Sequence, residues 1–126
     1  MKKEKFVLEF EMKSIPVSLL WSYIATASGL SRWFADEVTI DGKTYTFSWK
    51  GYSQVAQLQA TRSGVYVRLH WDDSTQKDFF EMRIAVNDIT DVTELIITDF
   101  SEPEERDDAR NLWISQIDTL RRRLGC

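Results

Sequence analysis

The sequence predicts a single α+β domain that spans residues 1–126, in which a curved antiparallel sheet holds a long C-terminal helix. Apolar residues alternate with polar ones near the start of the chain, and several more alternating segments follow residue 38. Glycine-containing turns separate these later segments. Near the end of the chain, apolar residues recur at helical spacing. Together these patterns indicate six or seven strands, two short helices after the first strand, and one long final helix.

The first strand is predicted over residues 6–12, where Phe6, Leu8, Phe10 and Met12 share one face. A helix is expected to open near Pro16, because proline suits the first helical turn. Gly29 is expected to end this helix. The pair Trp33-Phe34 is then expected on a second short helix or turn. The residues at helical spacing in the first helix are Leu19, Leu20, Tyr23, Ile24 and Ala27.

The middle of the chain reads as strands joined by turns. Asp41-Gly42 indicates a tight hairpin, and residues 53–61 are polar and weakly patterned. Across the loop at residues 72–77 we expect Trp71 to pair with Phe80, Leu69 with Met82 and His70 with Glu81. The apolar residues expected to face inward are Tyr45, Phe47 and Trp49, then Val65, Val67, Leu69 and Trp71, then Phe80, Met82, Ile84 and Val86, and finally Leu95 and Ile97.

The final helix has recognisable ends. Ser101 and Glu104 have the spacing of a capping box, and acidic residues at 102–108 suit the positive end of the helix dipole. Arg121–Arg123 and then Gly125 mark the other end. We expect the helix to pack across the concave face of the sheet through Leu112, Trp113, Ile117 and Leu120, within a stripe that also includes Ala109, Gln116 and Leu124.

Several short motifs resemble one known family. They are Ile15-Pro16-Val17 with Leu20-Trp21, the segment 30–34, Leu69-His70-Trp71, the segment 93–98 and the tryptophan of the final helix. The chain resembles the START-like or helix-grip superfamily, which includes the birch pollen allergen, and within it the activators of the heat-shock chaperone ATPase. Where that group often carries Gly-Gly before an aromatic strand, this chain has Asp41-Gly42-Lys43. The resemblance implies the helix-grip fold and a pocket between sheet and helix, which many relatives use for apolar ligands.

Composition narrows the classes of function. A net charge of -4 and an isoelectric point near 5.0 argue against nucleic-acid binding, which needs a basic surface. Cys126 is the single cysteine, so an intramolecular disulfide, a metal cluster and a thiol nucleophile are not expected. Glu9 and Glu11 interrupt the apolar core that a signal peptide would need, and no apolar run suits a membrane span. We therefore expect a cytoplasmic protein that binds neither nucleic acid nor membrane.

The sequence offers few groups for catalysis. Strand alternation places His70, the single histidine, on the solvated face of the sheet. Asp99 shares the phase of Leu95 and Ile97 and could face the mouth of the pocket, although exposure at the strand end is the favoured reading because an unpaired buried carboxylate is costly. The isolated glycines form no phosphate-binding loop. We expect no catalytic residue, metal or cofactor, and an enzyme of the cyclase or hydrolase type ranks third among the hypotheses.

The leading hypothesis is non-enzymatic binding of a small apolar ligand between the sheet and the final helix. The alternative is a protein-interaction module resembling the chaperone co-activators. The pair Trp33-Phe34 is expected to close one end of the pocket, by core packing or by ligand contact. Because the inward residues are bulky, we expect a small or partly filled cavity. The candidate ligand-binding residues are Trp33, Phe34, Phe47, Trp49, Leu69, Trp71, Phe80, Met82, Leu95, Trp113 and Ile117.

Overall fold

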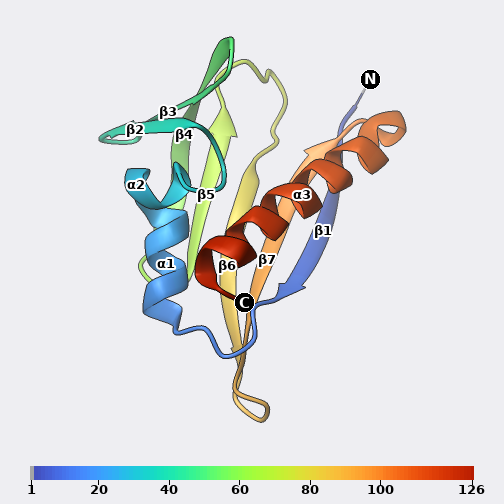
Figure 1. The fold of residues 1–126 in the computed structure, drawn as a ribbon. Helices are drawn as coiled ribbons and strands as arrows, with labels where there is room; N and C mark the ends of the chain where they lie inside the picture. The colour runs from blue at the N-terminus through green and yellow to red at the C-terminus, as the bar shows by residue number, and fades with distance from the viewer. Residues whose placement is uncertain (1) are drawn as a thin grey trace.

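A computed structural model describes residues 2–126, and it has one seven-stranded antiparallel sheet with a long helix lying across it (Figure 1). The strand order is β1-β7-β6-β5-β4-β3-β2, so the first strand pairs with the last. The curved sheet, the two short helices after β1 and the long C-terminal helix are the α+β arrangement that the sequence predicts. The elements are β1 Glu4–Glu11, α1 Val17–Ala25, α2 Ala27–Leu30, β2 Glu37–Asp41, β3 Thr44–Trp49, β4 Tyr52–Arg62, β5 Tyr66–Trp71, β6 Phe80–Asn87, β7 Val92–Ser101, the short 3-10 helix Pro103–Glu105 and α3 Arg106–Leu124.

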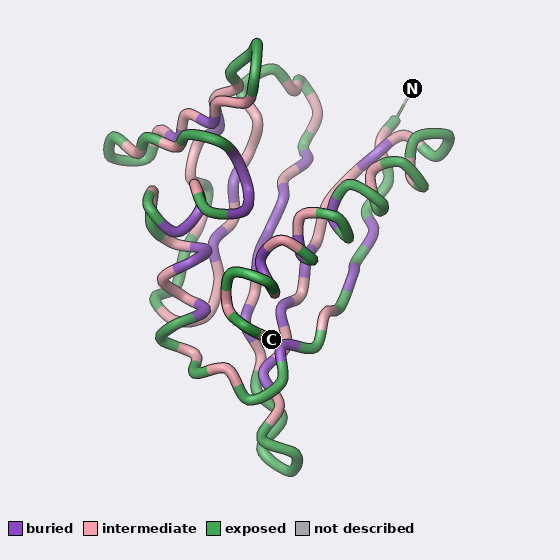
Figure 2. Tube along the Cα trace, viewed as in Figure 1, coloured by how far each residue is buried: buried purple, intermediate pink, exposed green. Residues whose placement is uncertain are grey.

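The hydrophobic core lies between α3 and the face of the sheet that α3 covers. Figure 2 shows buried residues along the central strands, and the turn between β6 and β7 as exposed. Alternate residues of β3, β5, β6 and β7 point into the core, as the period-two pattern predicts. Val86 was expected to face inward with them, but it lies near the exposed end of β6 and is itself exposed. α3 contributes Trp113, Ile117 and Leu120, which follow at helical spacing. Fully buried side chains of the sheet include Phe47, Leu69, Met82, Leu95 and Ile97.

The register between β5 and β6 differs by two residues from the expected one. Leu69 lies opposite Phe80, Val67 opposite Met82 and Arg68 opposite Glu81. The connection at 72–79 is no simple hairpin, because the carboxylate of Asp78 is buried in it and accepts hydrogen bonds from the Ser74 hydroxyl and the Lys3 ammonium. A two-residue shift keeps every side chain on its face of the sheet, so the predicted phase is correct although the pairing was wrong.

Two further strand predictions need correction. Residues 53–61, which the polar composition left without a clear pattern, lie within the long strand β4, and the register of this strand shifts between Leu58 and Ala60. Val65 was expected in the next strand, but it lies in the turn that precedes β5, where its N–H donates to the carbonyl of Arg62. A local irregularity of this kind interrupts the period-two pattern that reveals strands.

The predicted capping box is absent from the start of the final helix. Ser101 is the last residue of β7 and is buried, and its hydroxyl has no hydrogen-bond partner among residues 2–126. The chain passes through the 3-10 turn at Pro103, and α3 begins only at Arg106. The other end follows the prediction, because Gly125 adopts a left-handed conformation with φ of 78° after the three arginines.

Gly29 lies inside α2 and does not end the first helix. α1 ends at Ala25, and the Thr26 hydroxyl caps α2 by accepting a hydrogen bond from the Gly29 N–H at 2.9 Å. A Cβ at residue 29 would overlap the carbonyl of Ser22 and lie 2.6 Å from the Cα of Tyr23. The glycine is therefore needed because α2 packs directly on the backbone of α1.

Candidate functional site

A cavity of about 300 Å³ lies between α3 and one end of the sheet. Strand ends of β3, β5 and β6, the start of β4, the end of β7, the turn after α2 and the middle of α3 all contribute to its walls. Its volume lies at the lower end of the range for small-molecule sites. The lining residues are Phe34, Trp49, Tyr52, Gln54, Trp71, Phe80, Asp99, Leu112, Trp113 and Gln116.

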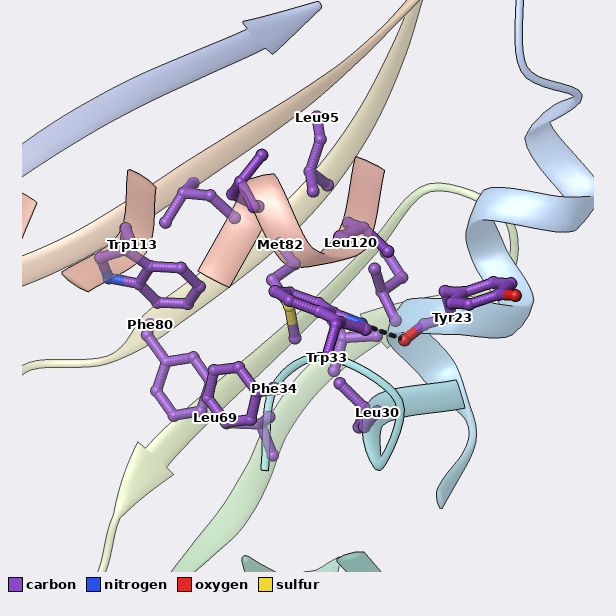
Figure 3. Close-up of a cluster of buried hydrophobic side chains, with 14 of the residues drawn as sticks. Tyr23, Leu30, Trp33, Phe34, Leu69, Phe80, Met82, Leu95, Trp113 and Leu120 are labelled. Carbon is purple, nitrogen blue, oxygen red and sulfur yellow. Dashed lines mark hydrogen bonds between the residues drawn. The ribbon is translucent and has the colours of Figure 1, made fainter. Parts of the chain in front are cut away.

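Phe34 connects the two sides of the cavity. Its ring stacks on Phe80 of the sheet with centroids 5.8 Å apart, and it lies 5.7 Å from the ring of Trp113 on α3. Trp33 holds this turn in place, because its indole N–H donates to the carbonyl of Tyr23 in α1 at 2.9 Å (Figure 3). Trp33 is thus a core residue that positions Phe34, while Phe34 itself reaches the cavity.

Two stacked aromatic pairs form the strand side of the cavity. Trp71 and Phe80, which flank the connection from β5 to β6, stack with centroids 4.9 Å apart. Trp49 and Tyr52 stack at 5.4 Å across the tight turn from β3 to β4. That turn contains Gly51 with φ of 89°, a conformation that favours glycine. Aromatic rings from the β3–β4 turn and from the β5–β6 connection therefore gather at one end of the sheet.

Asp99 brings a carboxyl group into this aromatic wall, so its expected exposure was wrong. One carboxyl oxygen accepts a hydrogen bond from the Trp113 indole N–H at 2.7 Å, and the other accepts from the Phe100 N–H at 2.7 Å. These bonds supply the partners whose absence would have made an inward carboxylate costly. Burial outweighs them and raises the pKa of Asp99 to about 6.

The carbonyl oxygen of Phe34 joins the turn after α2 to both walls. It accepts hydrogen bonds from the Trp49 indole N–H at 3.1 Å and from the Gln116 amide at 3.0 Å. Gln116 lies on α3 and Trp49 lies at the end of β3. The three parts of the wall are therefore fixed to one another before any ligand is present, which lowers the entropy cost of binding.

The structure divides the candidate binding residues into two groups. Phe34, Trp49, Trp71, Phe80 and Trp113 line the cavity. The others lie in the core behind it, and ligand contact is proposed for the lining group alone. The core group comprises Trp33, Phe47, Leu69, Met82, Leu95 and Ile117.

Sequence reasoning missed Tyr52 and Gln54 as lining residues, and it placed Leu112 wrongly. Alternation from Tyr52 through Gln54 to the buried Ala56 is the signal that could have found the first two. Leu112 was expected to pack on the sheet, but it is 62% exposed. The buried arc of α3 runs through Trp113, one residue further on, and leaves Leu112 at the rim of the cavity.

The single histidine lies away from the cavity. His70 is on the outer face of the sheet, as predicted, with its Nδ1 2.8 Å from the carbonyl oxygen of Asp78. Within residues 2–126 no group of three or more His, Cys, Asp and Glu side chains is arranged to hold a metal ion. The helices of this part of the chain are also too short or too polar to cross a membrane.

Comparisons with known proteins agree with this geometry. A family model for the START-like superfamily domain matches residues 1–126. The chain is similar to a protein from Bacteroides fragilis with a solution NMR structure, at 44% identity over 97% of this chain and 91% of that one, with a TM-score of 0.70. A search of curated proteins gave no match.

More distant structures share the fold alone. DynU16, a putative protein of the dynemicin biosynthetic locus, has a TM-score of 0.80 at 13% identity, over 96% of this chain and 47% of that one. Aha1 from Colwellia psychrerythraea, solved as a dimer, has a TM-score of 0.73 at 12% identity, over 98% of this chain and 96% of that one. Neighbours with such different names agree in architecture, so function has to be argued from the cavity.

Proposed function

This chain belongs to the START-like superfamily, and from that premise we propose that it binds a small apolar molecule in the cavity between the sheet and α3. The observation that carries the proposal is the wall of aromatic rings around a space of about 300 Å³. Aromatic residues with a few placed polar groups are the usual lining of small-molecule sites. A space of this size suits a ligand of one or two rings.

We propose binding and not catalysis for this site. A carboxyl with a raised pKa, such as that of Asp99, is also a property of general acids. Among the described lining residues, however, Asp99 has no second carboxyl, His or Lys beside it to complete an acid–base pair. Both of its oxygens already accept hydrogen bonds from Trp113 and Phe100. This arrangement suits a fixed polar contact better than proton transfer.

A matched pair of variants on β4 tests this proposal. Gln54 lines the cavity, whereas Ser53 is exposed on the opposite face of the same strand. With 2-naphthol as the probe, calorimetry should show saturable one-to-one binding to the parent protein and to Ser53→Trp. Gln54→Trp should lose most of this binding because the larger side chain takes up part of the cavity. Equal binding by both variants, or none by the parent, would contradict the proposal.

A second candidate function is a protein-interaction module resembling the chaperone co-activators. The observation that favours it is the exposed apolar surface at the rim of the cavity, where Tyr52 and Leu112 are 58% and 62% exposed. Native mass spectrometry of the protein purified from its own host separates the two candidates. A bound small molecule would support the first, and a protein partner in fixed ratio on ligand-free protein would support the second.

A further inference from the structure

The charged group in the cavity wall is acidic. Asp99 contributes a carboxyl group, and among the described residues that line the cavity none is Lys, Arg or His. The basic side chain that acts on Asp99 is Lys3, whose ammonium is 3.0 Å from a carboxylate oxygen of Asp78. Lys3 lowers the pKa of Asp99 and Asp78 raises it, so the two partners of this ion pair act on the Asp99 carboxyl in opposite directions.

The aromatic rings of the wall also favour a positively charged ligand. The face of an aromatic ring carries partial negative charge and attracts cations. Trp71 stacks on Phe80 and Trp49 stacks on Tyr52, and Phe34 and Trp113 complete the lining. A cation within this space would lie among these rings and beside one carboxylate.

Asp99 keeps capacity for another partner. An ionised carboxyl has two oxygens with about four lone-pair directions. Trp113 uses one of them at one oxygen, and the Phe100 N–H uses one at the other. The indole bond also fixes the orientation of the carboxyl group, so its position does not depend on a ligand. The group is held in place by the protein and can still accept a charge-assisted contact.

We infer that the ligand is a small ring compound with a positively charged nitrogen, either a protonated amine or a quaternary ammonium, and that this nitrogen contacts Asp99 while the ring lies among the aromatic side chains. This inference rests on the proposed function and narrows its ligand class. Negatively charged ligands such as fatty acids are disfavoured, because their carboxylates would face Asp99.

Two compounds of the same shape test the inference. Phenyltrimethylammonium and tert-butylbenzene differ in charge and hardly in volume, and benzoate provides an anion. At pH 7.5 we expect the cation to bind at least tenfold more tightly than the neutral compound, and benzoate most weakly. Asp99→Asn should weaken binding of the cation at least tenfold and change that of tert-butylbenzene less than twofold. Asp88→Asn, in the exposed turn before β7 and so at the other end of this strand from Asp99, removes the same charge away from the cavity and should change neither.

A pH titration of the parent protein gives the same test without a variant. Protonation of Asp99 between pH 7.5 and pH 5 should weaken binding of phenyltrimethylammonium, which keeps its charge throughout. His70 lies beside Asp78 outside the cavity, and binding of the uncharged tert-butylbenzene reports any change in the cavity itself over this pH range. Equal affinity for the two compounds, or an unchanged affinity in Asp99→Asn, would overturn the inference and leave the proposed function intact. Failure of all three compounds to bind would overturn the inference, and failure of 2-naphthol as well would overturn the proposed function.

Discussion

Asp99 lies at the point where the apolar face of β7 reaches the cavity. The same alternation that buries Leu95 and Ile97 points its carboxyl inward. The Trp113 indole N–H and the Phe100 N–H stabilise the group there, although burial still favours its neutral form. An ionisable residue in this position costs stability at neutral pH, which is consistent with a role in binding.

The raised pKa of Asp99 predicts the direction in which stability changes with pH. Because the folded-state pKa of about 6 exceeds the ordinary value of 3.8, this group stabilises the fold below pH 3.8, and the contribution is lost as pH rises through 6. The free energy of unfolding of Asp99→Asn, minus that of the parent, should therefore increase by about 2–3 kcal/mol between pH 4 and pH 7.5. Urea unfolding of both proteins at several pH values measures this difference.

Subtracting the free energy of unfolding of the parent from that of Asp99→Asn cancels the contribution of carboxyl groups whose pKa is lowered by folding. Burial acts to raise the pKa of Asp78, but hydrogen bonds from Ser74 and Lys3 outweigh it and lower that pKa. Burial likewise acts to raise the pKa of Glu81, but bonds from Arg83 and Arg68 lower it. These two groups stabilise the fold above their unfolded pKa values and lose that effect as pH falls. A difference that stays constant with pH would mean that Asp99 is solvated.

The alternation of apolar and polar residues predicted on which face of the sheet a residue lies better than it predicted that residue's hydrogen-bond partners. His70 lies on the outer face for the same reason that Leu69 and Trp71 lie on the inner one. For Asp99, alternation indicated the inward phase, but it did not reveal the indole N–H that makes an inward carboxyl tolerable. Such a partner comes from an element fourteen residues further along the chain and depends on how α3 lies on the sheet.

At the scale of elements, α3 is held by a narrow stripe of side chains. Trp113 is 5% exposed and Leu112 is 62% exposed, although they are neighbours in the sequence. Trp113→Ala should lower the free energy of unfolding by about 3–5 kcal/mol, because it removes a buried ring and leaves a cavity. Leu112→Ala, the matched control, should change it by less than about 1 kcal/mol. Equal losses in chemical denaturation would show that the helix is rotated from this placement.

Helix α3 and the β5–β6 hairpin show what local patterns leave open. Helical spacing predicted the apolar stripe of α3 but also included Leu112, which lies one position before the buried Trp113. The register of β5 against β6 depends on Asp78, which is buried in the connection between the two strands. The polar composition of this connection did not show that one of its carboxyl groups would be buried. Gly29 looked like a helix terminus, because its contact with the backbone of α1 exists only in three dimensions.

For the whole molecule, the sequence predicted the layers and the bulky inward set, and the resemblance placed a pocket between sheet and helix. The aromatic residues fill most of that space and leave about 300 Å³ at one end. How much remains depends on how Phe34, Trp71 and Phe80 stack, which composition does not determine. The cavity therefore joins segments from across the chain, and its stability is linked to the docking of α3.

Because the cavity exists only while α3 is packed on the sheet, we can predict in which segments a bound ligand slows local opening. The sheet is held by continuous backbone ladders, whereas α3 is attached to it through side chains such as Trp113, Ile117 and Leu120. A local opening that releases α3 from the sheet destroys the cavity. A bound ligand therefore makes such openings rarer, and the effect grows with the fraction of protein that has ligand bound. Hydrogen exchange with and without saturating phenyltrimethylammonium should slow most in the middle of α3 and in residues 31–35, and hardly at all in the exposed turn at 88–91. Slower exchange confined to the turn and to β1, with α3 unchanged, would place the ligand outside this cavity.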